Sequence, residues 1–371
     1  MIRIAKKMKE GVSSGVFPGG ILLVHHRGEI VFHEAFGSES SLPRSAAVTC
    51  ETLFDLASLT KTLATAAAVL LLAAQGRIAL SDLLFKFIPE FAIGAKKEIT
   101  LFHLLNHSSG LPDWRPYYQE IVKREEKEPG FLGSPEAKEA VYKMAHEEPL
   151  LELPGAKARY SDIGFILLGE VIERVAQEPL HRFCHPLFSK VGCHETSFIR
   201  RGRRPRAFQG RSFAATEAGT WRGKLIRGVV HDDNAYAMGG VAGHAGLFST
   251  AREVYRLVRL WLDSIEGKGA LDPELAALFV RRQTGSGVPA GTTWGLGWDT
   301  PSSPHSSSGQ FFSPSSFGHL GFTGTSVWVD LKRDLAVVLL TNRVHPSREN
   351  QKIRSFRPAL HDLIFQEVIG G

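Results

Sequence analysis

A serine and a lysine, spaced as S-x-x-K, are the first side chains in this sequence whose types and spacing could do covalent chemistry. Ser58 and Lys61 stand at the start of the stretch SLTKTLATAAAVLLLAA, which is otherwise rich in Leu and Ala. On a helix, residues i and i+3 lie on one face, so the hydroxyl and the amine would meet. A neighbouring amine can take or relay the serine proton and make the hydroxyl a nucleophile. The pair therefore indicates attack on a carbonyl carbon.

The surroundings of Lys61 decide whether it can act as a base. An ordinary lysine has a pKa of about 10.4, so it must become neutral or relay its proton to act at neutral pH. Burial against LATAAAVLLLAA, with a second cation or a phenol nearby, would lower that pKa. If Ser58 lies in the first turn, its backbone N–H is free to stabilise an oxyanion. The motif arises easily by chance, so the alternative is a solvated lysine at an ordinary helix start.

A tyrosine and an aspartate stand at the start of a second apolar pattern. YSDIGFILLGEVIERV begins at Tyr160 and carries an apolar stripe, which predicts a helix over 162–176. Asp162 could be the N-cap of this helix. A phenol at Tyr160, close to Ser58 and Lys61, could share the proton with them.

A third group lies near the C-terminus, in FGHLGFTGTSVWVD. His319 and Gly321 lead into a predicted hairpin, so we expect them on an edge strand beside a cleft. Gly321 would let the backbone of a substrate approach closely. The alternative for His319 is an exposed histidine on a strand.

Together these motifs resemble the serine β-lactamase and penicillin-binding protein superfamily, in its class C-like and esterase branch. SLTK, YSD and HLG follow one another in the order in which those proteins usually show S-x-x-K, Y-x-N, and K-T-G or H-x-G. Softer matches span nearly the whole chain: GVFPGGILLV, LLNHSSGLP, GGVAGHAGLFSTA, WGLGW and GFTGTSVWVD. The ordered set is far more specific than S-x-x-K alone.

The resemblance implies a role for each motif residue. Ser58 would be the nucleophile, Lys61 its base partner, and Tyr160 the group that protonates the leaving group. The oxyanion hole would be formed by the backbone N–H groups of Ser58 and Phe322, each such donor lowering the barrier by about 3–4 kcal/mol.

The resemblance also implies that Asp162, His319 and Gly321 contact the substrate, and two of these depart from the family pattern. Asp162 stands where Asn is usual, and its carboxylate would raise the pKa of Lys61 unless it caps the helix and faces away. His319 replaces a lysine that meets a substrate carboxylate, which weakens that contact at neutral pH. Both departures favour an esterase, amidase or peptidase over an efficient penicillin hydrolase.

The stretch 228–250, GVVHDDNAYAMGGVAGHAGLFST, resembles members of the superfamily that act on peptidoglycan fragments. Those members include N-acetylmuramoyl-L-alanine amidases and D-alanyl carboxypeptidase-like proteins. His231, Asp232 and His244 could be metal ligands, but their spacing is undiagnostic and loop packing is the preferred interpretation. The glycines match no nucleotide loop. We therefore expect a small-molecule or muropeptide-like substrate, no metal and no cofactor.

The fold class expected from the patterns and the resemblance is α+β, of the β-lactamase/transpeptidase type. Hairpins over 19–37 and 325–343, from both chain ends, would form one antiparallel sheet covered by terminal helices. Other helices are predicted over 60–75, 100–106, 135–146 and 251–265. Strand pattern is scarce between 53 and 235. We therefore predict a sheet domain from 1–52 and 236–371, with an inserted, mainly helical domain over 53–235.

Composition indicates a soluble protein. Of 371 residues, 43% are hydrophobic and 22% charged, and the formal net charge is +6. The basic run RRGRRPR is interpreted as a solvated loop, without a nucleic-acid-binding motif. The most hydrophobic segment, 63–74, is only about half as long as a helix that spans a bilayer. Three scattered cysteines and the lack of a signal-peptide pattern favour a cytoplasmic location. No nucleic-acid partner and no membrane association are expected, and the sequence does not give the oligomeric state.

The sequence thus predicts a serine hydrolase that works through an acyl-enzyme on an ester or amide of a small molecule or peptidoglycan-derived fragment. Weak or no β-lactamase activity is expected. One alternative is a catalytically silent module that binds a ligand in the same cleft. Another is a true β-lactamase or a D-Ala carboxypeptidase.

Overall fold

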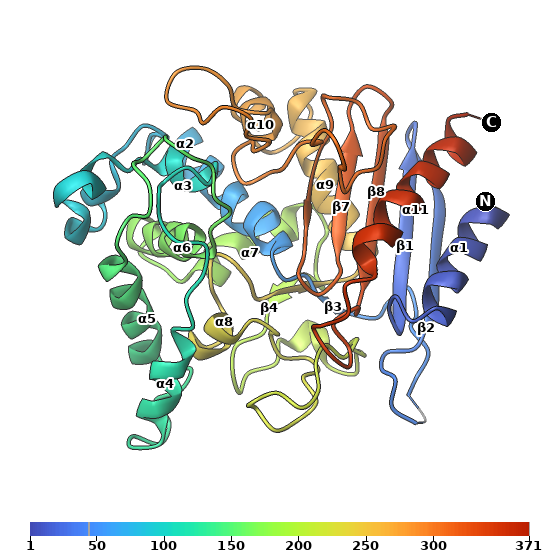
Figure 1. The fold of residues 1–371 in the computed structure, drawn as a ribbon, viewed down its shortest axis with the longest axis horizontal. Coiled ribbons are helices and arrows are strands. Elements are labelled where there is room, and N and C mark those ends of the chain that lie inside the picture. Colours follow the sequence, from blue (N-terminus) through green and yellow to red (C-terminus); the bar gives the residue numbers. More distant parts are fainter. Residues whose placement is uncertain (44, 371) are drawn as a thin grey trace.

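A five-stranded antiparallel sheet, built from both ends of the chain, lies between the two terminal helices and the other helices of the fold (Figure 1). The computed structural model describes residues 1–43 and 45–370. The strand order is β2-β1-β8-β7-β6. These strands are β1 (Gly19–His26), β2 (Glu29–Gly37), β6 (Phe317–Leu320), β7 (Ser326–Asp330) and β8 (Leu335–Thr341). Both predicted hairpins are present, and their joining in one sheet is confirmed.

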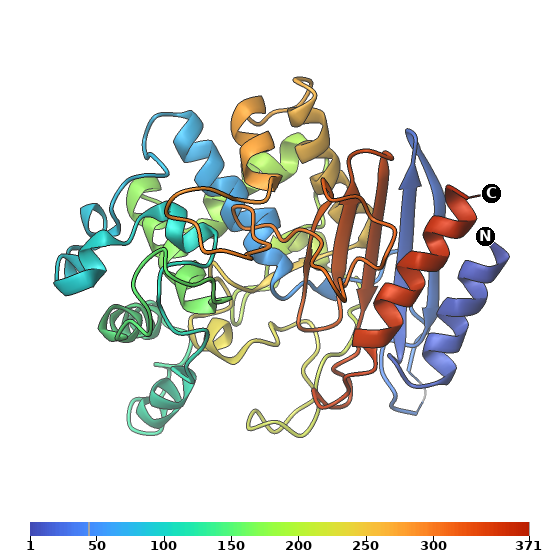
Figure 2. The ribbon, with the colours of Figure 1, turned by 45° about the horizontal axis from the view of Figure 1, so that its top comes forward.

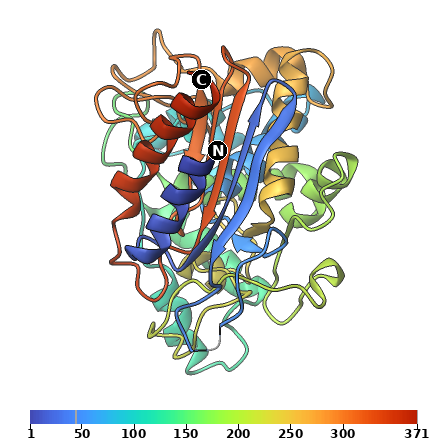
Figure 3. The ribbon, with the colours of Figure 1, turned by 90° about the vertical axis from the view of Figure 1, so that its right-hand side faces the viewer.

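Side chains alternate between the two faces of this sheet, and each face has its own core. Leu22 points toward the terminal helices α1 (Ile2–Ser13) and α11 (Ile353–Val368), which pack against each other. Figure 3 shows this helix pair lying across the sheet. Leu23 belongs to the larger core on the opposite face, where α9 (Ala251–Ile265) contacts β1 and β8. The predicted cover of terminal helices is therefore confirmed.

Most of the remaining helices gather on the α9 side of the sheet, as Figures 1 and 2 show. They are α2 (Ala67–Ala74), α3 (Leu101–Leu105), α4 (Tyr118–Glu125), α5 (Pro135–Glu147), α6 (Asp162–Ala176), α7 (Leu180–Lys190), α8 (Asp233–Ala237) and α10 (Pro273–Val280). Short 3-10 helices lie at Leu84–Lys86, Pro89–Phe91, Gly94–Glu98 and Arg206–Phe208. The helices predicted over 162–176 and 251–265 have these bounds in the structure.

Two features next to Ser58 differ from the expected pattern. The helix predicted over 60–75 begins as a π-helix (Lys61–Ala66) and becomes an α-helix only at α2. A second sheet, of order β3-β5-β4, lies where few strands are expected. Its strands are β3 (Phe54–Asp55), β4 (Ser197–Phe198) and β5 (Leu247–Ser249). They are too short for an alternating pattern to reveal them.

The expected α+β class is confirmed by this arrangement of antiparallel sheets and surrounding helices. The division into a sheet domain (1–52 and 236–371) and a helical domain (53–235) stays a prediction. Among residues 1–43 and 45–370, every helix is too short or too polar to span a bilayer.

Candidate active site

Ser58 lies in a tight turn between β3 and the π-helix. The preceding residue, Ala57, has a φ of 47°, a left-handed conformation that is uncommon for residues other than glycine. Asp55 Oδ1 accepts the backbone N–H of Ala57 at 2.9 Å. Thr60 Oγ1 accepts the backbone N–H of Leu247 at 3.1 Å, which ties the helix start to β5. Ser58 is thus presented on a strained bend that its neighbours hold in place.

The Lys61 side chain is completely buried, and its ammonium group has three acceptors. Nζ donates to Ser58 Oγ at 3.0 Å, to Asp162 Oδ1 at 2.6 Å and to the backbone oxygen of His244 at 3.2 Å. An ammonium group has three N–H donors, so each is used. The predicted meeting of the Ser58 and Lys61 side chains is confirmed, and the alternative of a solvated lysine is wrong.

Asp162 points toward Lys61 and does not cap helix α6. The N-cap is Ser161, whose Oγ accepts the backbone N–H of Gly164 at 3.1 Å. The expectation that Asp162 could be the cap is therefore wrong. Burial lowers the pKa of Lys61, but Asp162 and Tyr160 raise it more, and the pKa lies above its usual value. Lys61 is consequently an ammonium ion at neutral pH, and it can accept a proton only while giving one up.

The Tyr160 ring is partly buried in an aromatic cluster next to Lys61. Its centroid lies 4.7 Å from that of His107, 5.5 Å from that of Trp294 and 5.9 Å from that of His319. Lys61 Nζ lies 4.8 Å from the centroid of the Tyr160 ring. Burial raises the pKa of Tyr160, although interactions of its hydroxyl with Lys61 and Ser58 oppose the rise. The phenol is therefore protonated at neutral pH and close to both groups.

His319 lies on β6, the edge strand of the large sheet, as predicted. Its side chain is buried, so the alternative of an exposed strand histidine is wrong. Nδ1 donates to the backbone oxygen of Leu320 at 2.8 Å. Burial and the charge of Lys61 lower the pKa of His319 to about 3. The imidazole is therefore neutral at ordinary pH and offers no fixed charge to a substrate carboxylate.

Gly321 is required by packing within the protein. A Cβ at this position would lie 2.0 Å from Thr325 Oγ1 and 2.6 Å from the backbone oxygen of Leu56. Thr325 Oγ1 donates to that same oxygen at 3.1 Å. The close approach that the glycine permits is thus made by the protein's own loops.

The backbone N–H groups of Ser58 and Phe322 have no hydrogen-bond acceptor in the described part of the chain. Both residues line the same cleft. Arg343 Nε donates to the backbone oxygen of Phe322 at 2.8 Å, which fixes that peptide. Thr323 Oγ1 donates to the backbone oxygen of Asp55 at 2.8 Å and joins the loop after β6 to the turn that carries Ser58. Two fixed donors are therefore available beside the hydroxyl.

The cleft around Ser58 is a cavity of about 410 Å³. Its lining is formed by Ser58, Tyr160, Trp294, Asp299, His319, Leu320, Gly321, Phe322, Arg343, Gln351, Ile353, Arg354 and Arg357. Three of these side chains are guanidinium groups and one is a carboxylate. Burial raises the pKa of Asp299 to about 6, against hydrogen bonds from Thr293 and Thr300.

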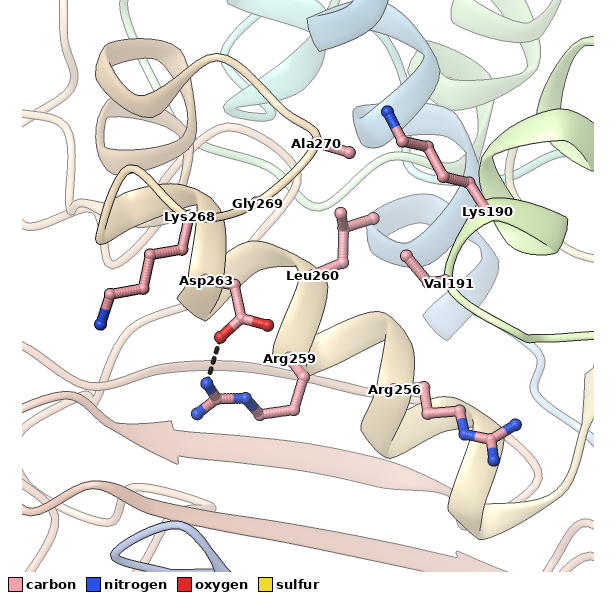
Figure 4. Close-up of a pocket in the computed structure, with 9 residues that line it drawn as sticks. All are labelled: Lys190, Val191, Arg256, Arg259, Leu260, Asp263, Lys268, Gly269 and Ala270. Atoms are coloured by element: carbon pink, nitrogen blue, oxygen red, sulfur yellow. Dashed lines mark hydrogen bonds and ion pairs between the residues drawn. The ribbon is translucent and has the colours of Figure 1, made fainter.

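A second cavity, between α7 and α9, is lined mainly by charged side chains and by no Ser, Thr, Tyr or Cys (Figure 4). Arg259 pairs with Asp263 one helical turn away, and Arg256 donates to the backbone oxygen of Gly192 at 2.6 Å. This cavity therefore offers neither a hydroxyl nor a thiol.

Residues 11–15, Gly-Val-Ser-Ser-Gly, match the G-x-S-x-G pattern of an α/β-hydrolase nucleophile. In the structure Ser13 ends the helix α1, and its hydroxyl donates to the backbone oxygen of Glu10 at 3.3 Å. The pattern here is part of a helix end and not a strand-to-helix elbow. Ser13 is therefore excluded as a nucleophile of that kind.

The polar residues of the 228–250 stretch form separate pairs. Asp232 Oδ1 lies 2.8 Å from His244 Nε2, and Glu217 Oε2 lies 2.9 Å from His231 Nε2. Arg348 Nε donates to both oxygens of Glu217. Within residues 1–43 and 45–370, no three His, Cys, Asp or Glu side chains are grouped to hold a metal ion.

Several residues at the site were not anticipated. Trp294 and Asp299 lie in and beside WGLGW, which the sequence singles out only as a soft match. Arg343 follows β8 and Arg357 lies on α11, and no local pattern marks either residue. His107 lies in LLNHSSGLP, another soft match, and packs against Tyr160.

Comparisons with known proteins agree with this geometry. The family model described as Beta-lactamase matches residues 4–359. The chain is 32% identical over 367 residues to a protein of Salmonella agona (strain SL483) named "Putative D-alanyl-D-alanine carboxypeptidase", covering 91% of this chain and 81% of the relative. The predicted resemblance is confirmed.

Two solved structures show the same fold. One is EstCE1, a hydrolase with promiscuous acyltransferase activity, with a TM-score of 0.72 and 22% identity over 96% of this chain and 98% of that one. The other is simvastatin synthase (LovD) from Aspergillus terreus, with a TM-score of 0.73 and 18% identity over 100% of this chain and 99% of that one.

Proposed function

The chain belongs to the Beta-lactamase family, and we propose that it is a serine hydrolase in which Ser58 is the nucleophile of an acyl-enzyme reaction on an ester or amide. The observation that carries this proposal is the contact of Lys61 Nζ with Ser58 Oγ, at 3.0 Å, in a buried site that opens to a cleft. A hydroxyl beside a buried amine, with two free N–H donors nearby, is the arrangement that acyl transfer requires.

The proton of Ser58 leaves through a relay. Because Lys61 is an ammonium ion, it takes the Ser58 proton only as it passes one of its own to Asp162, 2.6 Å away. The carbonyl carbon gains the Ser58 oxygen, and its own oxygen becomes an anion held by the N–H groups of Ser58 and Phe322. Lys61 stays charged throughout, so it also stabilises the negative charge that develops beside it.

Tyr160 completes the cycle at the leaving group. Its phenol is protonated at neutral pH, so it can donate as the bond to the leaving alcohol or amine breaks. The proton on Asp162 then returns through Lys61 and restores Tyr160. Water repeats the same steps on the acyl-enzyme and releases the acid, which leaves every residue in its starting state.

The substrate is proposed to be a small ester or amide of the peptidoglycan-fragment type. The name of the Salmonella relative supports this class. Arg343, Arg354 and Arg357 line the cleft, and Arg354 has no ion-pair partner in the described part of the chain. A cleft with more cations than carboxylates suits a substrate with a free carboxylate. Since His319 is neutral, we expect weak or no hydrolysis of β-lactams.

A cytoplasmic location is also proposed. Cys50, Cys184 and Cys193 are all free thiols, which suits a reducing compartment. Fractionation of cells that produce the protein would test this by measuring the share found in the cytoplasmic fraction.

The central test compares Ser58→Ala with Ser13→Ala. We expect Ser58→Ala to reduce hydrolysis of p-nitrophenyl butyrate by about 10⁴-fold or more, with an unchanged melting temperature. Ser13→Ala, which alters the other candidate serine motif, should behave as the wild type. Mass spectrometry after treatment with a fluorophosphonate should place one adduct on Ser58.

A catalytically silent binding module would give a different result. Such a protein would bind a muramyl peptide but show no adduct on Ser58 and no activity that Ser58→Ala removes. Release of D-Ala from a muramyl pentapeptide, compared with nitrocefin hydrolysis, separates a carboxypeptidase from a β-lactamase.

A further inference from the structure

Residues 107–113, which follow helix α3, run beside the Tyr160 motif and hold it in place. The backbone oxygen of Pro112 accepts the hydroxyl of Ser161 at 2.6 Å. The backbone oxygen of Asp113 accepts the backbone N–H of Asp162 at 2.8 Å. Residues 107–112 of this segment belong to LLNHSSGLP, which contributes no residue to the proposed reaction. Its contacts indicate that it shapes the site from behind.

His107 makes two further contacts, and they lie on either side of Tyr160. Its backbone oxygen accepts the backbone N–H of Arg159 at 2.8 Å. Its ring atom Nδ1 accepts the backbone N–H of Ser161 at 3.1 Å. The ring also packs against that of Tyr160, with 4.7 Å between centroids. One histidine therefore holds the residue before Tyr160, the residue after it, and its ring.

His107 carries a buried side chain at a position whose backbone conformation suits glycine. Its φ is 60°, in the left-handed region. Glycine adopts this conformation without strain, and asparagine adopts it more readily than most residues. A glycine would therefore satisfy the chain path at lower conformational cost. The buried imidazole must contribute contacts that offset this cost.

The hydrogen bond to Ser161 also defines the protonation state of His107. Nδ1 accepts an N–H, so the ring proton must be on Nε2. A doubly protonated ring would place two N–H groups against each other. Burial and the positive charge of Lys61 lower the pKa of His107 well below its usual value, which keeps Nδ1 an acceptor.

We infer that His107 is a positioning residue for Tyr160, which keeps the phenol within reach of Ser58 and Lys61. This inference rests on the proposed role of Tyr160 as the acid that protonates the leaving group. His107 is not among the residues that line the cleft. Loss of His107 should therefore slow acylation most for substrates whose leaving group must be protonated by Tyr160 as it departs.

A double-mutant cycle with two substrates tests this. p-Nitrophenyl butyrate has a leaving group that is stable as an anion, whereas ethyl butyrate has one that must be protonated. We expect His107→Gly to lower kcat/KM, which reports formation of the acyl-enzyme, by about 100-fold for ethyl butyrate and by less than about 5-fold for the p-nitrophenyl ester. In a Tyr160→Phe background the same change should cost less than about 3-fold, because its target is absent.

His107→Asn is the conservative partner variant. Its amide oxygen can accept the N–H of Ser161, and Asn tolerates the left-handed backbone. We expect it to retain activity on ethyl butyrate within about 3-fold of the wild type. Melting temperatures of all variants show whether they fold.

The outcomes separate three cases. Equal losses of kcat/KM for both substrates, or additive losses of kcat/KM in the double variant, overturn the positioning role. A folded His107→Asn enzyme that loses as much activity as Tyr160→Phe also overturns it, and this variant alone decides if His107→Gly does not fold. Wild-type rates for Tyr160→Phe on ethyl butyrate would instead reject the proposed role of Tyr160 while leaving Ser58 as the nucleophile.

Discussion

Two clusters of charged side chains contact the segment 55–58, and only one has access to the cleft. The lysine cluster contains Ser58, Lys61 and Asp162. The glutamate cluster contains Glu217, His231 and Arg348. The two are linked through Asp55, whose Oδ2 accepts the backbone N–H of His231 at 2.6 Å. Both clusters join a cation to a carboxylate at hydrogen-bond distance.

The difference lies in what completes each cluster. Both oxygens of Glu217 accept hydrogen bonds from charged or ring donors, and neither His231 nor Glu217 lines the cleft. In the lysine cluster one acceptor of the ammonium is a hydroxyl, and that hydroxyl faces the cleft. A buried ion pair is therefore not a reactive site by itself. Reactivity requires an exchangeable proton that a substrate can reach.

Among variants that disrupt one of the two clusters, we expect Lys61→Met to cause the largest loss of activity. It removes the relay from Ser58 while filling the same space with an apolar chain, so we expect esterase activity to fall by about 10³-fold or more. Lys138→Met is a matched control, because Lys138 forms an ion pair with Glu173 at the same 2.6 Å as Lys61 with Asp162. Steady-state kinetics should show the control unchanged. Comparable losses in both variants would contradict the contrast.

A smaller effect is expected for Asp162→Asn, which tests the relay. The variant lacks the carboxylate that receives the proton, so we expect its rate at neutral pH to fall by about 10- to 100-fold. Without Asp162, the pKa of Lys61 is also lower, because the largest interaction that raises it is gone. Activity of the variant should therefore rise with pH as Lys61 becomes neutral, whereas that of the wild type should stay flat from about pH 7 to 9.

The measurement for Asp162→Asn is a pH–rate profile for the p-nitrophenyl ester. A wild-type profile that rises through the same range as that of the variant would show that Lys61 must lose its proton beforehand. The relay would then be wrong, although Ser58 could still be the nucleophile.

The smallest effect on activity, and a clear one on stability, is expected for Glu217→Gln. Burial opposes ionisation of Glu217, but hydrogen bonds from His231 and Arg348 outweigh it and lower its pKa to about 2. Its contribution to the free energy of unfolding is therefore complete above about pH 4.5 and is lost as the pH falls toward about 2. We expect the variant to be less stable by about 2–3 kcal/mol at neutral pH, with activity per folded molecule nearly unchanged.

Thermal unfolding of the wild type and Glu217→Gln across this pH range provides the check. The difference between their melting temperatures should shrink as the solution becomes more acidic. A constant difference would mean that Glu217 acts through packing rather than charge. If the folded Glu217→Gln variant lost most of its activity, the glutamate cluster would take part in the reaction. The proposed difference between the two clusters would then be wrong.

Local signals explain which parts of the fold and site could be predicted from the sequence. The meeting of Ser58 and Lys61 follows from helical spacing, and the bounds of α6 and α9 follow from apolar periodicity and N-cap residues. The hairpins follow from paired apolar runs around turns. Each of these depends on residues that are near one another in the chain.

Contacts between distant parts of the chain could not be predicted in this way. Asp162 is wrong as a cap because Ser161 and Asp162 are both good N-cap types, and the choice depends on Lys61, 101 residues away. Arg343 and Glu217 have partners in other elements, so no local pattern marks them. The three short strands next to the site also leave no recognisable pattern in the sequence.

The hydroxyls of Thr323 and Thr325, which donate to the backbone oxygens of Asp55 and Leu56, have a consequence for how the enzyme would fail. These hydrogen bonds join the loop after β6 to the turn that carries Ser58, beside the cleft where substrate would bind. Breaking these two hydrogen bonds would move Phe322 away from Ser58 while leaving the helices intact. Enzymatic activity should therefore be lost at a lower denaturant concentration than the helical circular-dichroism signal. Activity would then report local opening of the site before global unfolding.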